Sequence, residues 1–203
     1  MSRSALGTLI LLLVAALGAR IVASQADDAA ALTERGVSKA RAGDLDGALA
    51  DFTQAIAVDP TYASAYYDRG LVKSKKGDID GAVADWTETL RLNPSHSGAH
   101  NNRGIAREQK GDLDGAIADF SDAITADVTN AQAYNNRGTA KMRKNDPDGA
   151  LADFTQAIAL DPKYGAAYFG RGQVKQKKGD LTGAAADFDR AGELDPQYKK
   201  LRR

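Results

Sequence analysis

Apolar and small residues recur with helical spacing along most of the chain, and the stretch before Pro94 is a clear example. Residues 82–90 place their apolar side chains on one stripe, which is the spacing of an amphipathic helix. Gly77 can take the left-handed conformation that ends a helix, and Asp78 can cap the next one. Pro94 ends the pattern because proline cannot continue a helix. The stretch predicts a helix–turn–helix unit, and no stretch alternates with the period of a β-strand.

The same unit is written five times, with a period of 34 residues and no insertion or deletion between copies. A proline closes every unit except the third, where Val128 takes its place. Repeats of this length indicate that neighbouring units stack and bury their apolar faces on one another. The five units span residues 29–62, 63–96, 97–130, 131–164 and 165–198.

Small and aromatic residues hold fixed places in every unit. A glycine in the middle of a helix costs about 1 kcal/mol relative to alanine, so five such glycines indicate close approach of two helices. These columns are Gly36, Gly70, Gly104, Gly138 and Gly172 in the first helices, with Ala48, Ala82, Ala116, Ala150 and Ala184 and the aromatic residues Phe52, Trp86, Phe120, Phe154 and Phe188 in the second.

This pattern of glycine, alanine, aromatic residue and proline resembles the tetratricopeptide repeat (TPR) family over 170 of the 203 residues. The resemblance implies an all-α fold, a right-handed α-solenoid spanning residues 27–198, whose first helices line a concave groove. In that family the groove binds an extended peptide or a helix of another protein. The expected partner is therefore a protein of unknown identity.

The N-terminus has the pattern of a secretory signal peptide. Arg3 precedes a short uncharged run, and small residues at 24–26 offer a cleavage site after Ala26. The run is shorter than the about 20 apolar residues of a membrane-spanning helix. We expect residues 1–26 to be removed and the protein to be exported, to the periplasm or the exterior of a bacterium. The alternative is an uncleaved helix that anchors the protein in the inner membrane.

Charge is balanced, with 27 basic and 27 acidic residues, which argues against a globally basic nucleic-acid binder. The chain has no cysteine, so disulfides and thiolate chemistry are excluded. Each first helix has an arginine, and each second helix has an aspartate sixteen residues later. We expect structural pairs, against the alternative of a basic strip for an acidic partner. The pairs are Arg35 with Asp51, Arg69 with Asp85, Arg103 with Asp119, Arg137 with Asp153, and Arg171 with Asp187.

The fifth unit has features of an end. Ala185 and Gly192 replace the large apolar residues that other units carry on the face expected to pack on the next unit. Residues 199–203 form a basic tail that we expect to be too short for a capping helix. The modified end face is therefore expected to keep the array soluble by itself.

The sequence contains no recognisable catalytic constellation, so we expect neither an enzyme nor a bound cofactor. His96 and His100 have a spacing that two metal ligands can use, but no third ligand is placed beside them in sequence, and we expect packing roles instead of a metal site.

Partner binding is expected on the inward face of the first helices, where amide side chains can hold a peptide backbone. The alternatives are a self-associating element of an envelope complex and a membrane-anchored adaptor. The candidate groove residues are Tyr67, Leu71, Asn101, Asn102, Ile105, Asn135, Asn136, Thr139, Phe169 and Gln173.

Overall fold

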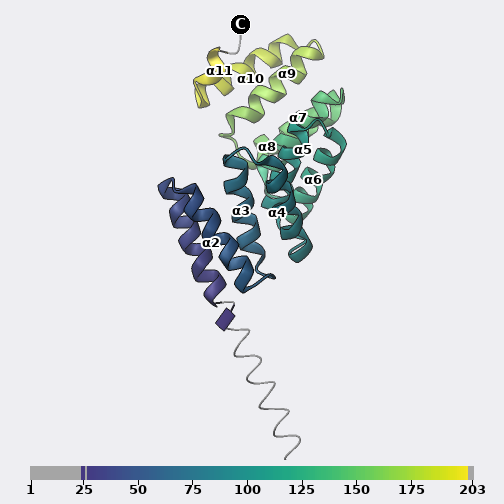
Figure 1. The fold of residues 1–203 in the computed structure, drawn as a ribbon. Coiled ribbons are helices and arrows are strands. Elements are labelled where there is room, and N and C mark those ends of the chain that lie inside the picture. Colours follow the sequence, from purple (N-terminus) through teal and green to yellow (C-terminus); the bar gives the residue numbers. More distant parts are fainter. Residues whose placement is uncertain (1–23, 26, 201–203) are drawn as a thin grey trace, which may run out of the picture. The chain divides into compact units, whose positions relative to one another are not determined.

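A computed structural model describes residues 24–25 and 27–200 of the chain. These residues form α-helices joined by short turns, and none of them lies in a β-strand (Figure 1). Within this part of the chain no helix is long and apolar enough to cross a membrane. The predicted signal peptide falls almost wholly outside the described residues, so its cleavage stays a prediction.

The helices follow one another in pairs, and the chain divides into two compact units between Asn93 and Pro94. The first unit contains the helical residues 27–42, α2 (Leu45–Val58), α3 (Ala63–Lys75) and α4 (Ile79–Leu92). The second unit contains α5 (Ser97–Gln109), α6 (Leu113–Ala126), α7 (Ala131–Arg143), α8 (Pro147–Leu160), α9 (Gly165–Lys177), α10 (Leu181–Leu194) and α11 (Gln197–Lys200).

Aspartate caps set the start of the second helix in every pair. The carboxylate of Asp78 accepts a hydrogen bond of 2.9 Å from the backbone N–H of Gly81, and the same bond recurs in the other four pairs. Gly77 precedes this cap with φ +87°, a conformation that suits glycine. Asn145 takes the same place in the fourth pair with φ 62°, since asparagine also tolerates this region.

The core is built from alanines and one aromatic ring per pair. Phe120 is fully buried and packs with Ala116 of its own helix and Ala140 of α7, so the core continues from one pair to the next. A Cβ added to Gly104 would lie 2.7 Å from Cε1 of Phe120. The repeated glycine therefore makes room for the aromatic ring of its own pair.

The C-terminal segment differs from expectation. Residues 197–200 form the short helix α11, which packs on α10 and includes the first two residues of the predicted basic tail. Gly192 leaves the space that Lys199 occupies, since a Cβ there would lie 2.7 Å from Cγ of Lys199. A small residue at position 192 lets this single helical turn fold back, and the expectation that the segment is too short for a capping helix stays a prediction.

Candidate functional site

Five buried aspartates bind the arginines of their own helix pairs. The closest contact between each carboxylate and its guanidinium is 2.7 Å, in all five pairs. Arg103 and Asp119 are the most enclosed of them, with side chains 14% and 2% exposed. A second cation lies within 2.9 Å of every aspartate: Lys39, Lys73, Arg107, Lys141 and Lys175. The basic residues of the first helices thus neutralise carboxylates of the second helices instead of forming a strip for phosphate groups.

The pKa values of Asp187 and Asp51 show how ion pairing keeps a buried carboxylate charged. Burial by itself would raise the pKa of Asp187, but hydrogen bonds from Arg171 and Lys175 outweigh it and lower that pKa below its usual range. A hydrogen bond from Arg35 likewise lowers the pKa of Asp51. These pairs are structural, and they leave the binding surface to other residues.

The expected asparagine ladder is largely occupied by bonds within the protein. Asn101 and Asn135 are 3% and 8% exposed. Asn136 donates a hydrogen bond of 3.0 Å to the side-chain oxygen of Asn101, and it accepts a longer one of 3.4 Å from Asn135. Asn102 and Tyr67 are half-buried and also have partners. The bond between Asn136 and Asn101 connects α7 to α5, and these internal bonds leave fewer amide atoms for a peptide backbone.

A pocket of about 310 Å³ lies between α7 and α9. Thr139 and Gln173 are exposed at this pocket, and Phe154 forms part of its wall. Phe169 also lines it, but Tyr198 of α11 stacks on that ring with centroids 5.0 Å apart. Ile105 lies elsewhere, packed on the Phe120 cluster of the core. Two of the expected groove residues of this unit are therefore exposed at one hollow, while Phe169 is partly covered by the chain itself.

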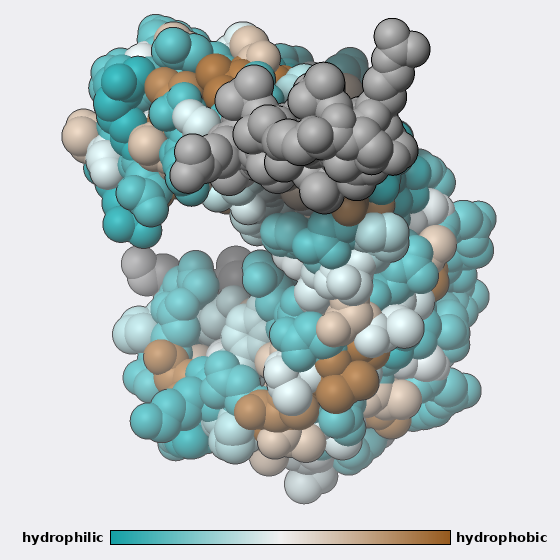
Figure 2. Space-filling view, turned by 90° about the horizontal axis from the view of Figure 1, so that it is seen from below, coloured by the Kyte–Doolittle hydropathy of each residue, from teal (hydrophilic) through white to brown (hydrophobic). Residues whose placement is uncertain are grey.

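The first unit has a second hollow, of about 360 Å³, between the helix of residues 27–42 and α3. We call it the Asp68 pocket. Its wall is mainly apolar, and Leu71, 39% exposed, lies at it. Its residues are Val37, Ala40, Arg41, Leu45, Phe52, Asp68, Leu71, Val72 and Lys75. The face in Figure 2 shows hydrophobic residues only as small patches among hydrophilic ones.

Asp68 is the unusual residue of this pocket. Its carboxylate makes no hydrogen bond or ion pair with any residue that the structure describes, although Arg41 and Lys75 line the same pocket. Burial raises its pKa to about 6, because an ionised carboxylate is poorly solvated there. Asp68 cannot be identified from its own helix, because its solvation depends on neighbours from other helices. The signal available was an acidic residue at the place of Asn102 and Asn136.

The two histidines have separate roles. Nδ1 of His96 accepts a hydrogen bond of 3.1 Å from the N–H of Ala99 and so caps α5. His100 is buried in α5, with its Nε2 atom 2.9 Å from the carbonyl oxygen of Pro94. Because His96 uses Nδ1 as a cap, that nitrogen is not available to join His100 at a metal ion.

Comparison with solved structures finds the same fold in several TPR proteins. MamA from Desulfovibrio magneticus RS-1 has a TM-score of 0.74 at 22% identity, covering 84% of this chain and 97% of that one. PilF of Pseudomonas aeruginosa has a TM-score of 0.77 at 15% identity, covering 88% and 86%. YrrB, described as a TPR protein with an unusual peptide-binding site, has a TM-score of 0.70 at 21% identity, covering 83% and 87%. A sequence search of curated proteins gave no match.

Family models match most of the repeat region. The model described as tetratricopeptide repeat matches residues 67–131 and 135–199, and the model described as TPR repeat matches residues 38–77. Together with the paired helices and their repeated caps, these matches settle the relationship. The chain belongs to the tetratricopeptide repeat family.

Proposed function

We propose that this TPR protein is an exported interaction module that binds a segment of a partner protein, an extended peptide or a helix, on the first helices of its repeats. TPR arrays serve as protein-interaction scaffolds, and YrrB, one of the structurally similar proteins, is described as having a peptide-binding site. The Asp68 pocket is the observation that carries the proposal, because it combines apolar surface with a polar group that lacks a partner.

The apolar part of the pocket suits one hydrophobic side chain of the partner. Val37, Leu45 and Phe52 contribute to its wall, and burying a side chain against them removes apolar surface from water. Leu71 would gain a neighbour and lose its exposure. A hydrophobic anchor of this kind in a preformed hollow is typical of the residues that dominate binding energies.

Asp68 adds a requirement for a hydrogen-bond donor. A half-buried carboxylate without a hydrogen-bond donor is costly. A hydrogen bond from a partner N–H to this carboxylate should therefore strengthen binding more than the same bond at an exposed site. Glu34 and Arg41 line an adjoining hollow with Asp68, and Lys75 lies on the other side, so the surroundings are close to neutral. The proposed ligand is a segment with an apolar side chain and a nearby N–H donor, from the backbone or from a basic residue.

Photo-crosslinking in the native cell tests this proposal with the full chain. A p-benzoylphenylalanine at Leu71 should crosslink to one distinct protein, and Asp68→Asn should weaken that product. The matched control is the same probe at Leu181, which is 66% exposed at the start of α10. The absence of a product at Leu71, or an equal product at Leu181, would count against the proposal. A product made of two copies of this chain would favour the self-associating alternative.

Export has its own test. Mass determination of the N-terminus of the protein from cells should give Asp27 as the first residue. An intact N-terminus in the membrane fraction would instead support the anchored adaptor in the inner membrane.

A further inference from the structure

The third helix pair carries two substitutions that face each other. His100 stands where Tyr66, Tyr134 and Tyr168 stand in other pairs, and each of those tyrosines lies 5.5–5.6 Å below the guanidinium of its arginine. Asp122 stands where the first and fourth units have glutamine. The same two columns touch in the fifth pair, where Tyr168 and Arg190 share a hydrogen bond. The third pair has thus replaced two ordinary positions in contact with an imidazole and a carboxylate.

One ring nitrogen of His100 is buried and has no hydrogen-bond partner among the described residues. Nε2 lies 2.9 Å from the carbonyl oxygen of Pro94, and because a carbonyl only accepts, Nε2 carries the proton. In a neutral ring Nδ1 then has a bare lone pair. That atom is buried without a hydrogen-bond partner among the described residues, and His100 is 8% exposed.

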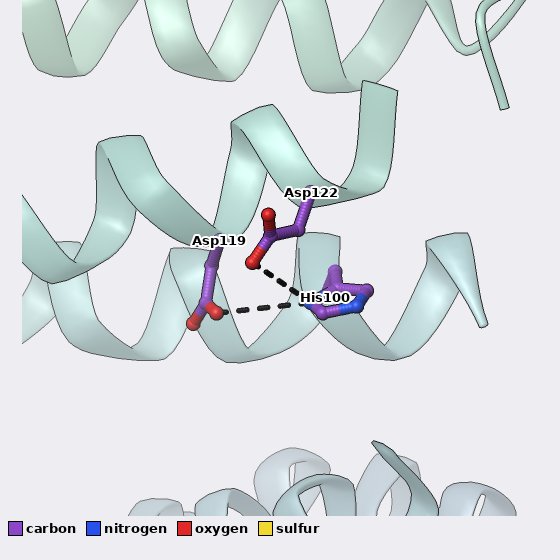
Figure 3. Close-up of side chains that lie close together, drawn as sticks. All are labelled: His100, Asp119 and Asp122. Carbon is purple, nitrogen blue, oxygen red and sulfur yellow. Dashed lines mark ion pairs between the residues drawn. The ribbon is translucent and has the colours of Figure 1, made fainter. Parts of the chain in front are cut away.

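Two carboxylates face that bare nitrogen. Figure 3 shows His100 of α5 opposite Asp119 and Asp122 of α6. Nδ1 lies 3.8 Å from Oδ1 of Asp119 and 3.9 Å from Oδ2 of Asp122. One ligand atom of each of the three residues lies within 4.8 Å of the other two, so a cation placed between them would be attracted by all three.

We propose that His100, Asp119 and Asp122 bind a divalent transition-metal ion of the zinc type. One imidazole nitrogen with two carboxylate oxygens is a donor set that Zn²⁺ uses, with water in the fourth position. A hollow of about 410 Å³ lined by Ser95, His100, Asp122 and Thr125 gives that water a place. Calcium and magnesium are less suitable, because they prefer oxygen ligands alone.

The geometry identifies the ligand that must move. Ligands of one tetrahedral zinc ion lie about 3.3 Å apart, so these three must close in on the metal. Asp122 can do so, because its side chain is 62% exposed and makes no hydrogen bond with the described residues. Asp119 is held by both Arg103 and Arg107 at Oδ2, and at Oδ1 it accepts from Nη2 of Arg103 at 2.7 Å and from Nε of Arg103 at 3.3 Å. Nε also donates to Oδ2 at 3.0 Å, so a metal ion at Oδ1 has only the longer of the two Nε bonds to displace. The two arginines weaken the attraction for a cation and make this site weaker than a structural zinc site.

The test is equilibrium dialysis of metal-free full chain against Zn²⁺. We expect one bound ion per chain, with binding at least about 10-fold weaker in His100→Tyr and in Asp122→Gln. Both substitutions restore residues found at these places in other units, so they are expected to keep the fold, which circular dichroism checks. The matched control is His96→Asn, because Asn130 makes the same cap on α7, and it should leave zinc binding unchanged.

Spectroscopy with Co²⁺ gives an independent readout. The wild-type chain should show the visible absorption of Co²⁺ bound in a coordination site of low symmetry, and His100→Tyr should lose this absorption. The proposal is overturned if the chain binds no zinc, if His100→Tyr and Asp122→Gln bind as wild type does, or if His96→Asn abolishes binding. It is also overturned if NMR titration shows the His100 ring still carrying both protons at pH 8, since a proton would then fill the place of the metal.

Discussion

Tyr198 stacks on Phe169 with ring centroids 5.0 Å apart and the ring planes 28° from parallel. Phe169 also meets Phe188 of α10, at 5.5 Å. The last helical turn therefore extends the aromatic packing of the fifth repeat and covers a residue that the sequence places on the binding face. The turn formed by α11 thus narrows the surface that a partner can reach at Phe169.

Removing the stacked ring should destabilise the fifth repeat. Tyr198→Ala is expected to lower the free energy of unfolding by roughly 1–2 kcal/mol, because it exposes Phe169 and leaves Gly165 without its neighbour. Urea unfolding followed by circular dichroism measures the change. Tyr198→Phe, which keeps the ring, should stay close to wild type, and a loss equal to that of Tyr198→Ala would mean that stacking is not the cause.

The arginine–aspartate pairs should contribute differently to the unfolding free energy, according to how deeply they are buried. Arg103→Ala leaves a nearly buried carboxylate with one cation less, and we expect it to cost about 3 kcal/mol of unfolding free energy. Arg35 makes the same contact but its side chain is 55% exposed, so Arg35→Ala should cost clearly less. Equal losses in the two variants, measured by urea unfolding, would show that burial does not set the strength of these pairs.

Because the helices approach closely at the repeated glycines, replacing a glycine by alanine should lower stability more where the space for the new methyl group is smaller. In Gly104→Ala the new Cβ meets the buried ring of Phe120 at 2.7 Å, and we expect a net loss of about 1–2 kcal/mol despite the better helix propensity of alanine. Gly138→Ala is the matched control, because its Cβ would lie 3.0 Å from Phe154. The midpoint temperature of thermal unfolding should be lower for Gly104→Ala than for Gly138→Ala, and the reverse order would contradict this packing.

Asp68 should make stability depend on pH in an unusual direction. Its pKa is about 6 in the folded protein, against the ordinary value of 3.8. Between these values the folded chain holds a proton that the unfolded chain releases, so this group's contribution to stability falls as pH rises from about 4 to 6. Asp68→Asn should therefore raise the unfolding free energy at pH 7.5 by roughly 1–2 kcal/mol and have little effect near pH 4.

The control for that experiment has the opposite sign. The pKa of Asp187 is lowered in the folded protein, so its contribution is present at neutral pH and is lost as pH falls below about 4. Asp187→Asn should be destabilising at pH 7.5. Urea unfolding of both variants from below pH 4 to pH 8 distinguishes the two behaviours, and a destabilising Asp68→Asn at pH 7.5 would show that its carboxylate has a partner in solution.

The local features of this fold can be predicted from the sequence, but the contacts between side chains that are far apart in the chain cannot. Asp78 and Gly77 define a turn through neighbours in the chain, and Arg103 and Asp119 meet because a fixed turn separates two helices. The contact of Asn136 with Asn101 joins residues 35 apart, and that of Tyr198 with Phe169 depends on a turn folding back over Gly192. Neither contact follows from the periodicity of the sequence. The sequence therefore predicts that the asparagine side chains and Phe169 are more accessible to a partner than they are in the structure.

The same limit applies to the candidate sites. The desolvation of Asp68 comes from a pocket built by residues of three helices, which the sequence of its own helix does not predict. His100 and Asp122 lie on different helices, and the spacing of His100 in the sequence points to His96 and not to Asp122. The repeat does make one departure visible, since His100 stands where three other units have tyrosine.

Peptide binding at the Asp68 pocket is the most direct test of the proposed function. Peptides selected from a random library on the full chain can be measured by fluorescence anisotropy against wild type, Leu71→Glu and Leu181→Glu. The account predicts that Leu71→Glu raises the dissociation constant by at least about 10-fold, because a charge enters the apolar pocket, while Leu181→Glu leaves it unchanged. Equal affinity for all three proteins, or failure to select any peptide, would contradict it.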